Sequence, residues 1–355
     1  MKTLFLFTLL ALPFFSFGQY TGLASEFFFG RHPSTRAESM GQAGVSLTGD
    51  LSTVSTNPAS LATIEGLAIN TALAEPYYFL DKAELTNINM SFKLHDFLTI
   101  GASRGHFNSG TEITFVDEEG NTFSHTPNQS TYALVLSSQP VKNLYFGIKT
   151  NYYTTNPSNE DFSTFYFDFG IIKRIQFPLK SFIRHSVNLG ASITNFSNSS
   201  IEIESSTEPL DEELPMINRL GASYLLTLDK KYLVRSLNTL DFLLQSEFQF
   251  LANSQYHTAY RVGAELILLE ILVLRAGYYH EKLDDHDNPS NRSEFSELTY
   301  GYGFRIPLQK LTNIPLIASF DYTNLPQPKT NESANFDNFS SYNLGVNWLL
   351  GHKSQ

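Results

Sequence analysis

The chain has no cysteine among its 355 residues. It is therefore neither a lipoprotein anchored through an N-terminal cysteine nor a secreted domain held together by disulfides. Charged residues are scarce as well, at 17% of the chain against roughly 25% in soluble proteins. A lipid-facing surface would account for the missing charge. The net charge of -11 speaks against a nucleic-acid partner, because binding a nucleic-acid backbone requires an extended basic surface.

Long apolar runs are absent after the first residues. The longest, residues 266–274, is interrupted by Glu270 and is shorter than the about 20 residues that a transmembrane helix needs. This excludes a helical inner-membrane protein, so any passage through a membrane must use strands.

The N-terminus differs from the rest of the chain. Lys2 precedes a mainly apolar stretch at residues 4–17, and the small residues Ser16 and Gly18 fit a cleavage site before Gln19. The stretch is too short for an ordinary membrane-spanning helix. We therefore expect residues 1–18 to be a cleaved signal peptide and the mature protein to be exported to the outer membrane.

Aromatic residues are abundant, and apolar residues alternate with polar ones. Aromatic side chains make up 14% of the chain, a composition that favours a single all-β unit over two soluble domains. Close to the C-terminus the alternation is complete: Tyr342, Leu344, Val346, Trp348 and Leu350 share one face of a strand, opposite Asn343, Gly345 and Asn347. One face of such a strand is apolar and the other is polar.

The same alternation recurs along the chain and predicts a transmembrane antiparallel β-barrel of about 14 strands over residues 66–355, within the range of roughly 8 to 26 of bacterial barrels. Most of the predicted strands have about ten residues, enough to cross a bilayer when tilted. We place them at residues 67–75, 85–94, 97–107, 131–139, 144–155, 163–174, 186–197, 216–228, 239–251, 256–268, 271–281, 297–307, 314–324 and 339–350.

The connections distinguish this barrel from a soluble β-sandwich, which would also alternate. Those after the second, fourth and tenth strands are short, whereas those after the third, seventh, eleventh and thirteenth are long and polar. Short periplasmic turns and long extracellular loops are typical of outer-membrane barrels. Acidic residues gather in the predicted outer loops, at Glu202, Glu204, Glu208, Asp211, Glu212, Glu213, Asp284, Asp285 and Asp287.

Several strands carry charges on their polar face. A Lys or Arg facing lipid at the midplane costs roughly 2 to 4 kcal/mol, so we expect these side chains to point into the lumen. Two interpretations follow: a lumen filled by charge pairs with no transport path, or a channel. The residues are Lys93, Lys149, Asp241, Glu247, Arg261, Glu265, Arg275, Arg305 and Asp321.

The alternation fails over residues 19–65. This stretch is rich in small residues and turn formers and contains Pro58, which suits a compact irregular segment. Its backbone groups would be unpaired in lipid, so it must lie in the lumen or the periplasm. Its motif reads Ala-x-x-Met-Gly-x-Ala-Gly-Val, then Asp50, then Asn-Pro-Ala-x-Leu, and the motif residues are Arg36, Met40, Gly41, Ala43, Gly44, Val45, Asp50, Asn57, Pro58, Ala59 and Leu61.

This motif resembles the N-terminal hatch of FadL-like outer-membrane proteins, in particular the PorV/PorQ family of the Bacteroidetes type IX secretion system. The resemblance covers about 30 residues. It implies a fourteen-stranded barrel with an N-terminal plug, and secretion-machinery proteins or secreted cargo as partners beside the outer-membrane lipid. Fatty-acid transporters of the FadL type usually carry a large hydrophobic insertion on the outer side, and the acidic loops of this chain depart from that pattern.

Three local patterns resemble known functional motifs, but we expect none of them to carry that function here. Gly101-Ala-Ser103-Arg-Gly105 matches a nucleophile elbow but lies within a predicted strand, where no strand-to-helix turn exists. The acidic group at residues 284–287 lacks the spaced ligands of a calcium loop. Gly301 and Gly303 share one strand face and are expected to make room inside the barrel. We predict no catalytic residue, metal or cofactor.

Aromatic pairs near predicted strand ends are expected to form girdles at the membrane interface. They are Tyr77, Tyr78 and Phe79 in the first outer connection, with Tyr152, Tyr153, Tyr278 and Tyr279 at strand ends. The alternative for these residues is a ligand-binding aromatic box. For the whole protein, the first hypothesis is a non-enzymatic barrel serving type IX protein secretion or surface attachment. The alternative is a FadL-like channel for small hydrophobic solutes, and a third is an outer-membrane enzyme acting on lipid.

Overall fold

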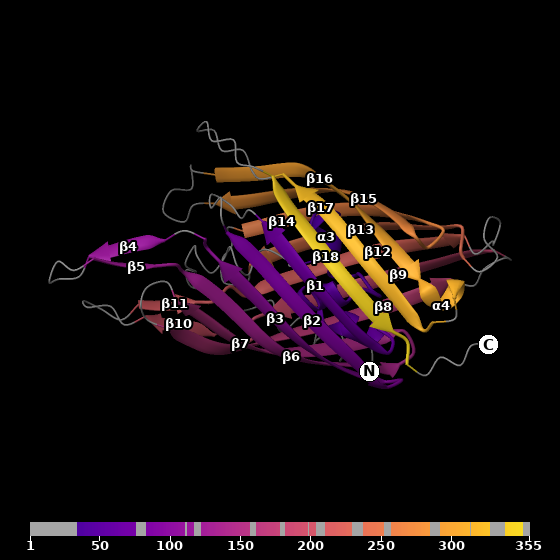
Figure 1. The fold of residues 1–355 in the computed structure, drawn as a ribbon, viewed down its shortest axis with the longest axis horizontal. Helices are drawn as coiled ribbons and strands as arrows, with labels where there is room; N and C mark the ends of the chain where they lie inside the picture. Colours follow the sequence, from indigo (N-terminus) through magenta and orange to yellow (C-terminus); the bar gives the residue numbers. More distant parts are fainter. Residues whose placement is uncertain are drawn as a thin grey trace, which may run out of the picture.

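The computed structural model describes residues 34–75, 83–110, 112–116, 122–156, 161–177, 182–197, 199–203, 210–228, 237–251, 257–284, 292–312, 314–326 and 338–350. Within these residues, fourteen strands form one closed antiparallel barrel (Figure 1). They follow one another around the wall in chain order, and β1 closes the barrel against β18. The predicted signal peptide, residues 1–18, lies outside the described residues.

The barrel strands agree with the sequence prediction, which is confirmed in number and order. They are β1 (Leu67–Glu75), β2 (Glu84–His95), β3 (Leu98–Asn108), β6 (Asn128–Val141), β7 (Leu144–Asn156), β8 (Phe162–Phe177), β9 (Ile183–Thr194), β12 (Ile217–Leu228), β13 (Leu240–Leu251), β14 (His257–Leu268), β15 (Leu272–Asp284), β16 (Arg292–Pro307), β17 (Leu316–Leu325) and β18 (Phe339–Trp348). The main difference is length: β6 and β16 begin three and five residues earlier, among mostly polar residues, and β8 continues to Phe177.

The alternation separates lipid from lumen as expected. On β18, Leu344 and Val346 are 58% and 49% exposed on the outer surface, whereas Asn343 is 5% exposed and faces inward. Leu344 pairs with Thr71 on β1 and with Phe320 on β17, so these three side chains form one outward row across the seam. The apolar surface is therefore the exterior of the barrel.

Short and long connections lie at opposite ends. The β2–β3, β6–β7 and β14–β15 connections each comprise two or three residues, and Leu269 and Glu270 have positive φ angles of 53° and 58°. Positive φ at both central residues is what a type I′ hairpin turn requires. At the other end, the pairs β4–β5 (Ile113–Val116, Thr122–His125) and β10–β11 (Ser200–Ile203, Leu210–Glu213) extend beyond the barrel (Figure 1).

The helical elements are short. They are α3 (Thr35–Glu38), η2 (Leu51–Ser55) and η3 (Pro58–Thr63) before the first strand, and α4 (Leu308–Leu311) between β16 and β17. No helix among the described residues is long and apolar enough to span a membrane.

Epitope insertion tests the orientation of the barrel. If the short turns face the periplasm, a tag between residues 204 and 209, in the β10–β11 connection, should bind antibody on intact cells. A tag at Lys142, in the β6–β7 turn, should bind antibody only after the outer membrane is permeabilised. Equal labelling of both tags on intact cells would contradict the orientation.

Candidate functional site in the barrel lumen

Residues 34–66, called here the N-terminal segment, lie inside the barrel. Each of the three short helical elements is started by a polar side chain that accepts a backbone N–H: Ser34 from Ala37, Asp50 from Ser52, and Asn57 from Ala59. Such N-caps satisfy donors that a short helix leaves unpaired. The segment is thus compact through its own hydrogen bonds, and most of its residues are buried.

Glycines of the barrel wall allow the segment to approach closely. A Cβ atom added at Gly147 would lie 2.2 Å from the carbonyl carbon of Pro58, and one at Gly277 would lie 2.1 Å from the Gly41 nitrogen. Both distances are shorter than any van der Waals contact, so only glycine fits there. The prediction that Gly301 makes room inside the barrel agrees with this, since a Cβ atom there would lie 2.6 Å from the Ser39 Cβ.

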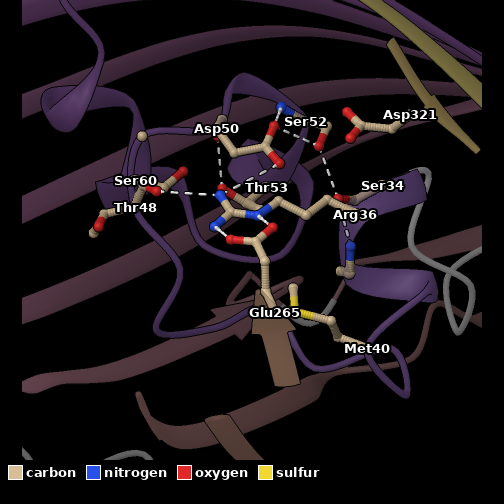
Figure 2. Close-up of polar contacts among 12 residues, drawn as sticks. Ser34, Arg36, Met40, Thr48, Asp50, Ser52, Thr53, Ser60, Glu265 and Asp321 are labelled. Atoms are coloured by element: carbon tan, nitrogen blue, oxygen red, sulfur yellow. Dashed lines mark hydrogen bonds and ion pairs between the residues drawn. The ribbon is translucent and has the colours of Figure 1, made fainter. Parts of the chain in front are cut away.

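An ion pair joins the segment to the wall. The Arg36 guanidinium donates from Nε to Glu265 Oε2 at 2.9 Å and from Nη2 to Oε1 at 2.6 Å (Figure 2). Such a bidentate pair fixes orientation as well as distance. Burial alone would lower the pKa of Arg36, but Glu265 and Asp50 outweigh it and raise the pKa above its ordinary value. Arg36 therefore stays charged within the lumen.

The Arg36–Glu265 ion pair is part of a larger buried network of charged side chains in the barrel wall. Glu265 also accepts from Arg275 Nε at 2.7 Å, and Arg275 Nη1 donates to Asp321 at 2.6 Å. Arg305 lies 3.7 Å from the same Glu265 carboxylate. Seven of the nine charges that were predicted to face the lumen pair with one another or with the segment: Lys93, Glu247, Arg261, Glu265, Arg275, Arg305 and Asp321. Lys149 pairs with Asp168 instead.

A second carboxylate holds the segment by its backbone. Glu247 Oε2 accepts from the Gly44 and Val45 nitrogens at 2.7 and 2.8 Å. The opposite oxygen, Oε1, accepts from Arg261 Nη1 at 3.2 Å. Asn57, which the sequence motif singled out, donates from Nδ2 to the Val45 carbonyl at 2.7 Å. Carboxylate and amide side chains thus satisfy backbone groups that are buried between segment and wall.

The remaining motif residues pack against the wall or hydrogen-bond to it. Met40 and Ala59 are completely buried, and the Ala43 carbonyl accepts from Gln245 Nε2 at 2.8 Å. Leu61 belongs to an apolar cluster with Val135 of β6. The structure therefore brings the motif to one place. Two of the wall residues it contacts, Glu247 and Glu265, were predicted as lumen charges, but nothing in the sequence linked them to the motif.

Two apolar clusters lie at the end of the lumen with the long connections. One cluster of buried side chains comprises Tyr153, Tyr166, Ile201, Leu214, Ile217 and Leu251. A second comprises Ala74, Ala83, Leu85, Tyr279 and Leu325. Sequence reasoning missed both clusters, because these residues occupy the strand face that is polar further along the same strands.

The prediction of a membrane girdle is wrong for two of the tyrosines. Tyr153 and Tyr279 are 1% and 0% exposed, and they point into the lumen. Their neighbours Tyr152 and Tyr278, which are 37% and 39% exposed, face outward as the girdle requires. Alternation allows only one residue of each adjacent pair to face lipid. Residues 77–79 lie outside the described residues.

A cavity of about 170 Å³ lies at the opposite end of the lumen, beside the N-terminal segment. Its walls come from the segment at Asp50 and Ile64, and from β1, β16, β17 and β18. Arg305, Asn343 and Asn347 line it. The cavity is therefore lined by both polar and apolar side chains, and it adjoins the ion-pair network.

The other sequence patterns lie away from this site or outside the described chain. Ser103 is in the interior of β3, so the strand-to-helix turn of a nucleophile elbow is absent there. Of the acidic group at residues 284–287, residues 285–287 lie outside the described residues.

No protein-family model matches the chain, and no curated protein matches it. Solved barrels of FadL type resemble its fold at low identity. A Pseudomonas aeruginosa FadL homologue is 10% identical, with a TM-score of 0.47 over 89% of this chain and 98% of that one. The Pseudomonas putida toluene transporter TodX is 12% identical, with a TM-score of 0.43 over 93% and 98%. The Ralstonia pickettii toluene transporter TbuX is 8% identical, with a TM-score of 0.42 over 87% and 96%.

Proposed function

We propose that this protein is a non-enzymatic outer-membrane channel that admits small hydrophobic solutes and is closed by its N-terminal segment. The observation that carries the proposal is the apolar lining of the lumen at the end with the long connections. A channel for hydrophilic solutes presents polar side chains along its interior. Here two clusters of buried side chains at that end consist of tyrosine, leucine, isoleucine and alanine.

Two barriers lie between these apolar clusters and the other end of the lumen. The first is a layer of buried charge, in which Arg219 and Arg261 both donate to Gln249. The second is the N-terminal segment with its Arg36–Glu265 ion pair. An apolar solute would strip these groups of their partners, which is costly in a buried site. Passage therefore requires the segment to move, and the segment is proposed to act as a plug.

A reversible cross-link tests this role in transport. Thr35 Oγ1 and Ser341 Oγ are 2.7 Å apart across the segment–wall contact, and the chain has no native cysteine. Cysteines at both positions should form a disulfide that locks the segment to β18. Cells carrying the barrel should take up N-phenyl-1-naphthylamine, a neutral hydrophobic dye, faster than cells without it. Oxidation should slow uptake in the double variant alone, and reductant should restore it.

The single variants Thr35→Cys and Ser341→Cys are the matched controls, because neither can form the cross-link. Dye uptake that does not depend on the barrel would contradict the solute-channel proposal. Dye uptake that depends on the barrel but is equally fast with and without the cross-link would show that the segment does not block the path of the solute.

A second candidate function is protein secretion or surface attachment. It is favoured by the β4–β5 and β10–β11 hairpins, which extend beyond the barrel and offer a surface to a protein partner (Figure 1). Purification of the tagged full-length chain from its native membrane in mild detergent separates the two candidates. A stoichiometric protein partner would favour secretion, and a barrel isolated without one would favour the channel.

A further inference from the structure

Arg104 breaks the apolar exterior of the barrel. It lies on the outward face of β3 and is exposed, between the outward-facing Ile88 of β2 and Tyr132 of β6. Ile88 and Tyr132 are each 47% exposed. No ion pair joins Arg104 to a carboxylate among the residues that the structure describes. A lipid-facing cation without a protein partner is costly unless it lies near the membrane interface.

The strand register places Arg104 at such a boundary. Three outward-facing rows cross β2, β3, β6, β7 and β8 in neighbouring registers. The row nearer the short turns is mostly apolar: Met90, Ala102, Leu134, Thr150 and Phe167. The middle row holds Arg104 among apolar and aromatic residues: Ile88, Arg104, Tyr132, Tyr152 and Phe165. The row nearer the long connections is polar: Thr86, His106, Ser130, Thr154 and Ser163.

Three of the five residues in the middle row are aromatic: Tyr132, Tyr152 and Phe165. Tyr152 and Phe165 are in ring contact, with centroids 4.8 Å apart. Aromatic girdles mark the level where hydrocarbon gives way to lipid headgroups. Arg104 is therefore at headgroup level, and with the long connections outside the cell this is the outer leaflet.

The side chain of Arg104 is oriented for an anion. Its Cζ lies 5.7 Å from the centroid of the Tyr132 ring, a cation–π contact that leaves the guanidinium N–H groups free to donate. One row further out, His106 Nδ1 and Ser130 Oγ are 2.8 Å apart and hydrogen-bonded. A guanidinium beside an imidazole is a pair of donors that matches a phosphate.

We propose that Arg104, with His106 held beside it by the buried Ser130, binds the phosphate of a phosphorylated lipid in the outer leaflet. The site opens sideways into the membrane rather than into the lumen, so the phosphate arrives on a lipid. Its acyl chains lie along the apolar row below, against Ala102 and Leu134. This site is separate from the lumen and does not depend on what the barrel transports.

The test compares lipid retention by the full-length protein in neutral detergent, measured by native mass spectrometry. The probes are diphosphorylated lipid A, its dephosphorylated form, and sodium phosphate. The wild-type protein should retain diphosphorylated lipid A, and Arg104→Gln should reduce the retained fraction by about tenfold, as expected for loss of one charged hydrogen-bonding group. Heat-modifiable migration on gels verifies that each variant is folded.

Lys173→Gln is the matched control. Lys173 is also an exposed outward-facing cation, but it lies on β8 towards the short turns. The Lys173→Gln substitution should leave retention of diphosphorylated lipid A unchanged. Equal retention by wild type and Arg104→Gln would overturn the proposal, as would equal retention of the dephosphorylated lipid. Displacement of the lipid by millimolar sodium phosphate would also overturn it, because the site would then bind a free anion.

Discussion

Deletion of residues 36–61 is expected to leave a barrel that still assembles and that conducts ions where the intact protein conducts little. None of the described residues in this stretch contributes a strand to the barrel. The fourteen wall strands satisfy their backbone hydrogen bonds among themselves, so closure does not require the segment. Water would enter the lumen and solvate Glu247 and Glu265. Heat-modifiable migration measures assembly, and planar-bilayer recordings measure conductance.

A milder variant provides the control for this deletion. Arg36→Ala keeps the segment but removes the bidentate ion pair, and breaking a buried pair typically costs about 3 to 5 kcal/mol. We expect brief openings rather than a permanently open pore. A truncated barrel that assembles but conducts no better than the intact protein would show that the segment does not close the pore. Complete loss of assembly would show that it belongs to the folding core.

Leu344→Arg is expected to prevent most of the protein from assembling in lipid vesicles. Leu344 is 58% exposed in the middle of β18 and faces hydrocarbon. An arginine at the bilayer midplane costs roughly 2 to 4 kcal/mol, a large part of the stability of a typical domain. The fraction of heat-modifiable protein after refolding into vesicles measures the effect.

Asn347→Arg, on the same strand, is the matched control. Asn347 lines the cavity beside the N-terminal segment, together with the carboxylates of Asp50 and Asp321, which can pair with a cation. The Asn347→Arg substitution should therefore have little effect on the folded fraction. Equal loss from both variants would mean that the two faces of β18 have been misassigned.

The wall of the barrel was predictable because each strand carries its own information. Alternation specifies which residues face lipid without reference to any other strand, and this is why Leu344 and Asn343 were assigned correctly. The rule failed at Tyr153 and Tyr279, because adjacent aromatic residues were both assigned to the girdle although their side chains must face opposite ways. The alternation rule also did not predict the two apolar clusters, which occupy the inward face near strand ends.

The interior of the lumen was less predictable. The motif around Arg36 and Asn57 marked a compact segment, and the strands marked inward charges, but the partners are far apart in sequence. Glu265 is 229 residues from Arg36, and no local pattern relates the two. Pairing of this kind depends on the closed tertiary structure, which only the assembled barrel provides.

The long sequence separations also constrain the order in which the molecule folds. The N-terminal segment is synthesised before every strand, yet Thr35 bonds to Ser341, 306 residues later, on the strand that completes the wall. Contacts of such high contact order form late, because chain entropy opposes them until the intervening strands are paired. The glycine contacts leave the segment little room to slide into a finished barrel. The wall must therefore close around a segment that is already in position, with the β1–β18 seam as the last step.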